Sequence, residues 1–321
     1  MQADLELGYF YNSRTRYLDV ALQFETISPL MSRLEDAHRP VMPDTQWLER
    51  MYNNRMRVPD HGDYFARWAA ESALVRQHLP CERDVAYGDD PREKLDAFHT
   101  PRKGAPLVVF IHGGYWKALD KSHHSFLAAA LHEAGAGVVV PNYAFCPRMT
   151  IPQITLQVAR AVAWTWRNAS RLGGDARRIT VIGHSAGGHM AAMMMACAWN
   201  VFDKDLPPAL VKGAMGVSGL YDLEPLMHTP SLQEVLRITP EQVHAASPAR
   251  LPRPAKGRFY SVVGGLESGE YLRLNRLIQQ AWSRERVPVA ATLAGLNHFS
   301  ILDALAKPGH RLNSLARELI G

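Results

Sequence analysis

The stretch RITVIGHSAGG, residues 178–188, places a serine between glycines at the end of an apolar run. Its centre, Gly183 to Gly187, fits the pattern G-x-S-x-G, which is typical of a sharp turn between a strand and a helix that directs the serine toward a substrate. Glycines are needed there because a side chain would collide where the turn closes. A turn of small residues without a catalytic role also fits this short pattern. Other parts of the sequence are needed to distinguish a catalytic turn from a structural one.

The chain of 321 residues has an ordinary globular composition, with 47% hydrophobic and 21% charged residues. This length is sufficient for one large α/β domain, and no Pro/Gly/Ser-rich linker divides it. The formal net charge of +5 is dispersed, without a basic run or a basic patch interleaved with aromatic residues. Nucleic-acid binding is therefore not indicated.

The N-terminal residues contain early acids and no apolar core, so they do not resemble a secretory signal. No apolar run approaches the roughly 18 residues of a transmembrane helix, so we expect no membrane association. The three cysteines, Cys81, Cys146 and Cys197, are too few for a disulfide framework. We therefore expect reduced thiols in a cytoplasmic protein.

From about residue 105 onward, apolar strand-like runs alternate with segments of helical spacing. Such alternation predicts an α/β fold, with a mostly parallel sheet and helices on both of its faces. Antiparallel opening strands are expected within residues 84–100. The strands expected after them are residues 106–112, 136–143, 177–183, 212–219, 257–265 and 287–295.

The segment FIHGGYW, residues 110–116, follows an expected strand and precedes a helical segment. Its two glycines let backbone N–H groups turn inward without obstruction by a Cβ atom. With the G-x-S-x-G turn about 70 residues later, this order is typical of α/β-hydrolases, in which Ser185 would be the nucleophile. The N–H groups expected to bind the reaction's oxyanion are those of Gly114, Tyr115 and Ala186.

A nucleophilic serine needs a base, and the base needs an acid that orients it. His298, in AGLNHFSIL, lies in the loop after the last expected strand and is the favoured base. In α/β-hydrolases the acid stands between the serine and the histidine in the chain. Glu267, in VVGGLESGEY after the penultimate strand, is the favoured acid. Asp222, after the strand before it, and Glu270, at the start of the next helix, remain the alternatives.

Two aromatic side chains are expected to border the substrate pocket. Trp116 directly follows the oxyanion glycines, although packing beneath the loop is an equal alternative. Phe145, in NYAFCPRMTIP, follows the carboxyl end of a strand, where ligands of open α/β sheets bind; core packing is its alternative.

We expect no metal and no nucleotide cofactor. The spacings H-x-x-x-H, H-E-x-x-H and C-x-x-C do not occur, although the chain has 14 histidines. The sequence also has no G-x-G-x-x-G after the first strand and no P-loop lysine.

Together, HGGYW, GHSAGGH and LNHFSIL resemble the kynurenine formamidase (arylformamidase) group of α/β-hydrolases, which is similar to the hormone-sensitive-lipase-like esterases. The segment YNNR…VPD, residues 52–60, adds to a resemblance that spans about residues 45 to 305. It implies hydrolysis of N-formylkynurenine, or of a related aryl formamide or ester, through an acyl-enzyme and without a cofactor. Glu267 stands where these enzymes more often carry an aspartate.

We expect residues 1–80 to form a helical N-terminal extension or cap, and residues 81–321 to form the catalytic domain. A lid insertion is expected near residues 222–256. The partner is a small-molecule ester or amide, and a homodimer is left open. The alternative functions are a broad-specificity carboxylesterase and a non-catalytic binding protein on the same fold; a full set of serine, acid and histidine argues against the latter.

Overall fold

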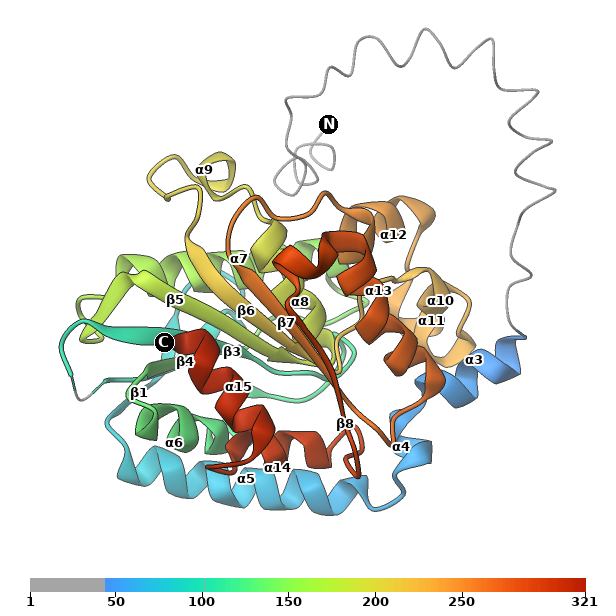
Figure 1. Cartoon of the computed structure of the whole chain (residues 1–321), viewed down its shortest axis with the longest axis horizontal. Helices are drawn as coiled ribbons and strands as arrows, with labels where there is room; N and C mark the ends of the chain where they lie inside the picture. The colour runs from blue at the N-terminus through green and yellow to red at the C-terminus, as the bar shows by residue number, and fades with distance from the viewer. Residues whose placement is uncertain (1–43, 101) are drawn as a thin grey trace, which may run out of the picture.

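The computed structural model describes residues 44–100 and 102–321. Figure 1 shows a twisted sheet covered by helices on both sides. Of the predicted extension over residues 1–80, residues 1–43 lie outside the described residues. The strands are β1 (Cys81–Ala86), β2 (Lys94–Phe98), β3 (Ala105–Ile111), β4 (Gly137–Pro141), β5 (Gly174–His184), β6 (Val211–Val217), β7 (Arg258–Gly264) and β8 (Val289–Leu293).

The helices pack on this sheet or follow one another at its edge. The longer ones are α3 (Thr45–Tyr52), α5 (His61–His78), α6 (Phe126–Glu133), α7 (Ile151–Arg167), α8 (Ala186–Ala196), α13 (Gly269–Arg286) and α15 (Arg311–Ile320). The shorter ones are α4 (Asn54–Arg57), η2 (Lys121–His123), α9 (Trp199–Phe202), α10 (Glu224–Met227), α11 (Pro230–Leu236), α12 (Pro240–Ala246), η3 (Pro248–Arg250) and α14 (Ser300–Ala306).

The eight strands form one sheet in the order β1-β2-β4-β3-β5-β6-β7-β8. The β1–β2 and β2–β4 pairs are antiparallel, and the other five pairs are parallel. The predicted mostly parallel sheet with antiparallel opening strands is therefore confirmed. Because the parallel strands run in one direction, the loops that follow β3, β5, β7 and β8 meet at the same edge.

Both faces of the central strands β3, β4, β6 and β7 are buried, which explains why these strands are almost continuously apolar. Successive side chains of a strand point to opposite faces. In β3, Val108 and Phe110 pack with α5, α6, α14 and α15, whereas Val109 and Ile111 pack with α7, α8 and α13. Figure 1 shows α5, α6, α14 and α15 along one face of the sheet.

The stretch predicted as a lid, residues 222–256, contains the short helices α10, α11, α12 and η3. Its prolines begin these helices, because proline lacks only an N–H that has no partner in the first helical turn. Helix α3 packs against α10, α11 and α13. Helix α3 and this stretch therefore lie together beside the sheet, while movement of the stretch as a lid and the division at residue 80 stay predictions.

Candidate active site

The G-x-S-x-G turn connects β5 to α8 and has Ser185 at its apex. The φ and ψ angles of Ser185 are 57° and −119°, a strained conformation for a residue other than glycine. A Cβ atom on Gly183 would lie 2.0 Å from the carbonyl oxygen of Gly187. One on Gly187 would lie 2.0 Å from the carbonyl oxygen of Ile111. Both glycines are therefore required for the turn to close.

His298 lies in the loop between β8 and α14, and its Nδ1 atom is 2.6 Å from Oε2 of Glu267. Both side chains are buried. The Asn297 side chain shapes this loop, because its Oδ1 atom accepts the N–H groups of Phe299 and Ser300 at 2.9 and 2.8 Å. A carboxylate only accepts hydrogen bonds, so the Nδ1 atom carries the proton and Nε2 is left as an acceptor.

The second oxygen of the Glu267 carboxylate is also held by hydrogen bonds. This Oε1 atom accepts the Ser218 hydroxyl at 2.6 Å and the Gly264 N–H at 2.8 Å. These bonds compensate the cost of burying the carboxylate and fix the oxygen that faces His298. The hydrogen bonds therefore orient the Glu267 carboxylate toward the imidazole.

The two alternative acids have other partners. Asp222 pairs with Arg250 at 3.1 Å. Glu270 accepts the Tyr52 hydroxyl at 2.7 Å and pairs with Arg273 at 2.8 Å. Of the three acids considered from the sequence, the structure brings Glu267 into contact with His298.

His184 connects the histidine loop to the serine turn. Its Nε2 atom donates to the carbonyl oxygen of His298 at 2.8 Å, and the next residue in the chain is Ser185. Burial, followed by electrostatic repulsion between the protonated forms of the two neighbouring rings, holds the pKa of His184 well below its ordinary value. The ring is therefore neutral and acts as a fixed hydrogen-bond donor.

The loop after β3 has an unusual backbone conformation from Gly114 onward. Gly114 has φ 109°, and a Cβ atom there would lie 2.1 Å from the carbonyl oxygen of Ala118. A Cβ atom on Gly113 would lie 3.0 Å from that of Ser185, so this glycine lets the loop approach the nucleophile. Within the described residues, no hydrogen bond occupies the N–H groups of Gly114 and Tyr115. These N–H groups are available to an oxyanion, as is expected of Ala186 at the start of α8.

A cavity of about 370 Å³ opens in front of Ser185 and His298. Its walls come from the N-terminal helices α3 to α5, the loop after β3, and helix α11. The aromatic residues that line it are Tyr52, Phe65, Trp68, Tyr115 and Phe299. Two cationic side chains, Arg55 and Lys117, also line it, and no acidic residue does so in the described part of the chain.

Two expected pocket residues are corrected by the structure. Trp116 is fully buried and lies edge-on to His189, with ring centroids 5.0 Å apart, so it packs beneath the loop. Phe145 is covered by the Arg92 guanidinium group at 3.9 Å and lies edge-on to Tyr143. Neither ring lines the cavity. Trp116 is buried by its packing contacts, whereas Phe145 is only partly buried and is held by Arg92 and Tyr143 instead.

Sequence analysis missed several residues around the site. Asn54 of α4 donates to the Tyr271 hydroxyl at 2.8 Å, and the Tyr271 ring lies 4.8 Å from that of His298. The segment YNNR contributes to the family resemblance, but its sequence does not indicate where its side chains lie. Ser218, which contacts Glu267, follows β6 in the motif VSG and carries no sequence signal of its own.

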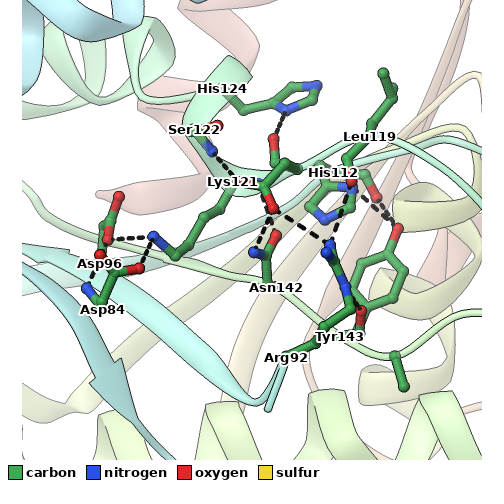
Figure 2. A network of polar contacts seen from close by, with 12 residues as sticks. Asp84, Arg92, Asp96, His112, Leu119, Lys121, Ser122, His124, Asn142 and Tyr143 are labelled. Carbon is green, nitrogen blue, oxygen red and sulfur yellow. Dashed lines mark hydrogen bonds and ion pairs between the residues drawn. The ribbon is translucent and has the colours of Figure 1, made fainter.

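A network of polar contacts supports the loop after β3 (Figure 2). The Tyr143 hydroxyl donates to the carbonyl oxygen of His112 at 2.8 Å, and Arg92 donates to the Tyr143 carbonyl at 2.8 Å. Asn142 donates to Asp120 at 2.6 Å. Burial raises the pKa of Asp120, but hydrogen bonds from its surroundings outweigh this and lower it to about 2. The network therefore contains a permanent negative charge beside a permanent positive one.

A buried ion pair of Lys121 and Asp96 lies at the end of the same network, with the ammonium 2.6 Å from the carboxylate; the exposed Asp84 carboxylate lies 2.8 Å from the same ammonium. Burial lowers the pKa of Lys121, but the hydrogen bonds to the two carboxylates outweigh it and raise the pKa. Removing one partner of such a pair would leave an uncompensated buried charge. This pair therefore ties η2, which follows the loop, to the opening strands of the sheet.

No group of three or more His, Cys, Asp and Glu side chains within residues 44–100 and 102–321 could hold a metal ion. The same residues include no helix that is long and apolar enough to cross a membrane.

Comparisons with known proteins agree with this geometry. Residues 95–235 match the family described as BD-FAE. The kynurenine formamidase of Danio rerio is 32% identical over 246 residues, which cover 74% of this chain and 81% of that protein. The esterase LipC of Mycobacterium tuberculosis is 33% identical over 160 residues, or 47% of this chain and 40% of that protein.

A solved structure is similar over nearly its whole length. The crystal structure of a candidate thioesterase from Silicibacter sp. TM1040 is 30% identical to this chain and superposes with a TM-score of 0.74. The match covers 85% of this chain and 98% of the solved one. The likeness therefore extends over the sheet and the helices around it.

Proposed function

The chain belongs to the kynurenine formamidase family of α/β-hydrolases, and we propose on this basis that it cleaves an aryl formamide of the N-formylkynurenine type through an acyl-enzyme on Ser185. The predicted fold and family are confirmed. Its general class is that of a hydrolase acting on formamides or esters. The proposal adds the nucleophile, the other catalytic residues and the substrate.

One observation carries the assignment of the catalytic residues. His298 and Ser185 line the same cavity. Glu267, which does not line the cavity, fixes the His298 ring through a contact of 2.6 Å to Nδ1. A base whose Nδ1 proton is held by a carboxylate presents an unprotonated Nε2 atom to a serine hydroxyl. This arrangement supports Ser185 as nucleophile, His298 as general base and Glu267 as the orienting acid.

In the first half of the reaction, Ser185 Oγ attacks the formyl carbon while His298 Nε2 takes the hydroxyl proton. The carbonyl oxygen becomes an oxyanion, which the N–H groups of Gly114, Tyr115 and Ala186 bind. Glu267 stays ionised and stabilises the imidazolium. His298 then gives its proton to the amine nitrogen, the C–N bond breaks, and the free aryl amine leaves a formyl ester on Ser185.

The second half of the reaction repeats these steps with water. His298 takes a proton from a water molecule, whose oxygen attacks the formyl carbon. The oxyanion forms again at the same N–H groups. When the ester bond breaks, formic acid leaves and ionises to formate in water, and Ser185 regains its proton from His298.

The walls of the cavity support an aryl substrate with a negative charge. Apolar rings such as Phe65 and Phe299 offer stacking surfaces for an aryl group. Arg55 has no ion-pair partner among the described residues, and Lys117 contacts only the carbonyl oxygen of Ser231, at 3.5 Å. The Arg55 guanidinium lies 5.7 Å from the centroid of the Phe65 ring, and neither cation has an ion-pair partner among the described residues, which favours a carboxylate-bearing substrate over a neutral ester.

The experiment that tests the function compares kcat/KM on N-formylkynurenine and on p-nitrophenyl acetate. A higher value on the formamide supports the proposal, and a higher value on the ester identifies a carboxylesterase instead. Labelling with a fluorophosphonate probe, followed by peptide mass spectrometry, locates the nucleophile. We expect the adduct on Ser185 and none in Ser185→Ala; absence of labelling and of turnover would indicate a binding protein.

We also propose that the enzyme works in the cytoplasm as expected from its thiols, since Cys81, Cys146 and Cys197 are all free. Cell fractionation tests this location. The homodimer left open by the sequence is tested by sedimentation velocity of the purified chain.

A further inference from the structure

The loop that carries the oxyanion donors is strained at two consecutive residues. Tyr115 and Trp116 have φ angles of 50° and 52°, directly after Gly114. Left-handed backbone is unfavourable at residues other than glycine, and it persists only where surrounding contacts hold it. The contacts that hold this loop are therefore a part of the site's construction.

The Tyr115 hydroxyl makes two short contacts outside its own loop. It lies 2.6 Å from the backbone carbonyl oxygen of Tyr52 in α3 and 2.7 Å from the Tyr271 hydroxyl in α13. A carbonyl oxygen can only accept, so the single Tyr115 proton goes to Tyr52. Tyr271 must then donate its own proton to Tyr115. Because each hydroxyl has one proton to donate, the direction of both hydrogen bonds is fixed.

The chain of hydrogen bonds continues at both ends. Asn54 Nδ2 donates to the Tyr271 hydroxyl at 2.8 Å. The Tyr52 hydroxyl donates to Glu270 at 2.7 Å and so ties α3 to the start of α13. Burial raises the pKa values of both Tyr115 and Tyr271, so these hydroxyls keep their protons. We call the four residues Tyr52, Asn54, Tyr115 and Tyr271 the tyrosine clamp.

We propose that Tyr115 is a positioning residue, whose hydroxyl, fixed by Tyr271 and by the Tyr52 carbonyl, holds the strained loop so that the N–H groups of Gly114 and Tyr115 point at the reaction's oxyanion. The inference rests on the proposed acyl transfer at Ser185. It assigns to α3 and α13 a part in catalysis, because they hold the loop from outside the sheet. Donors must be in place before the charge develops if they are to stabilise the transition state.

The test uses Tyr115→Phe, which keeps the ring and removes the hydroxyl. Removing one oxyanion donor outright costs about 10²–10³ in kcat. A donor that is only misaligned should cost less, so we expect kcat to fall by about 10–10² with KM changed less than about twofold. Tyr221→Phe is the matched control, since Tyr221 is fully buried and its hydroxyl bonds to Ser261 at 3.0 Å, away from this loop.

Binding measurements separate positioning from substrate contact, because Tyr115 also lines the cavity. A trifluoromethyl ketone adds to a serine nucleophile and develops an oxyanion. We expect its affinity for Tyr115→Phe to fall by the same factor as kcat/KM. The affinity for the aryl amine product, which develops no oxyanion, should stay within about twofold. Equal losses for both ligands would overturn the proposal, since the hydroxyl would then be a ground-state contact or a fold determinant.

A second variant keeps the test decisive if Tyr115→Phe does not fold. Tyr271→Phe breaks the same link from the helix side, and it also removes a hydrogen bond between the Tyr271 hydroxyl and the Ser185 side chain, so kcat should fall at least as far as in Tyr115→Phe and more than KM rises. Where both variants fold, the double variant should cost less than the product of the two single losses, because both hydroxyls hold one loop. If Tyr115→Phe is fully active while Ser185→Ala is inactive, the role of the tyrosine clamp is refuted and the proposed function is not. Activity in Ser185→Ala refutes the proposed function.

Discussion

Glu267 and His298 form a buried contact of 2.6 Å although 31 residues separate them in the chain. Glu267 follows β7, and His298 follows the neighbouring strand β8. The contact therefore arises from the parallel pairing of the last two strands, which places the loops after them side by side. A glutamate serves in this position because Ser218 and Gly264 fix its longer side chain from behind.

We predict that Glu267→Gln lowers kcat by about 10²–10⁴, with little change in KM or in melting temperature. The amide keeps the shape of the side chain but removes its charge, and it can favour the wrong imidazole tautomer, which costs roughly 10⁴ in a related catalytic triad. Steady-state kinetics measure the loss. Asp222→Asn is the control and should lose less than about tenfold, because Asp222 pairs with Arg250 instead. Reversed results would transfer the acid's role to Asp222.

Ser218→Ala should lower kcat by about 3- to 10-fold and leave KM unchanged. The substitution removes a hydrogen bond to the charged Glu267 carboxylate, while the bond from the Gly264 N–H remains. Ser261→Ala is a suitable control, since this buried hydroxyl donates to Asn275 and does not contact the site. A loss as large as that of Glu267→Gln would contradict the supporting role given to Ser218.

Arg55→Gln should reduce kcat/KM for carboxylate-bearing aryl formamides by about 5- to 50-fold and leave neutral esters within about twofold. The reason is that Arg55 lines the cavity without an ion-pair partner among the described residues, so a charged substrate group gains most from it. Arg57→Gln in the same short helix is the matched control, because Arg57 does not line the cavity. Equal effects of both variants, or equal effects on charged and neutral substrates, would argue against a role in specificity.

Stability should fall as the pH is lowered from 7 toward 4, because buried histidines resist protonation. Burial lowers the pKa of His112 to about 4, that of His124 to about 3 and that of His189 to about 4. The unfolded chain binds these protons near its ordinary pKa of about 6.5, so each residue's stabilisation is complete above that pH and is lost toward its folded pKa.

Urea unfolding at several pH values measures this effect. Each fully titrating histidine contributes a slope of about 1.4 kcal/mol per pH unit between the two pKa values. His124→Phe should reduce the slope between pH 6 and 4 by one such contribution, even if its overall stability is lower. An unchanged slope in this variant would mean that His124 is protonated in the folded state.

The local features of this protein were predictable from sequence because they depend on residues close together in the chain. The glycines beside Ser185 and the alternation of strands and helices depend on backbone sterics and on the burial of both sheet faces. The chain order of Ser185, Glu267 and His298 depends on which strand each residue follows. The turns and the strands leave patterns within about ten residues, the order of the three residues can be read along the chain, and the structure contains each of these features.

Only the tertiary structure decided what surrounds the cavity. Tyr52 and Glu270 are 218 residues apart, and Tyr115 and Tyr271 are 156 apart, so no local pattern indicates that their side chains meet. Trp116 follows the oxyanion glycines directly, yet its left-handed backbone and the buried space beside His189 turn it away from the substrate. The direction of such a side chain depends on contacts with elements that are distant in the sequence. These contacts form only when α3, α11 and α13 pack beside the carboxyl ends of the strands.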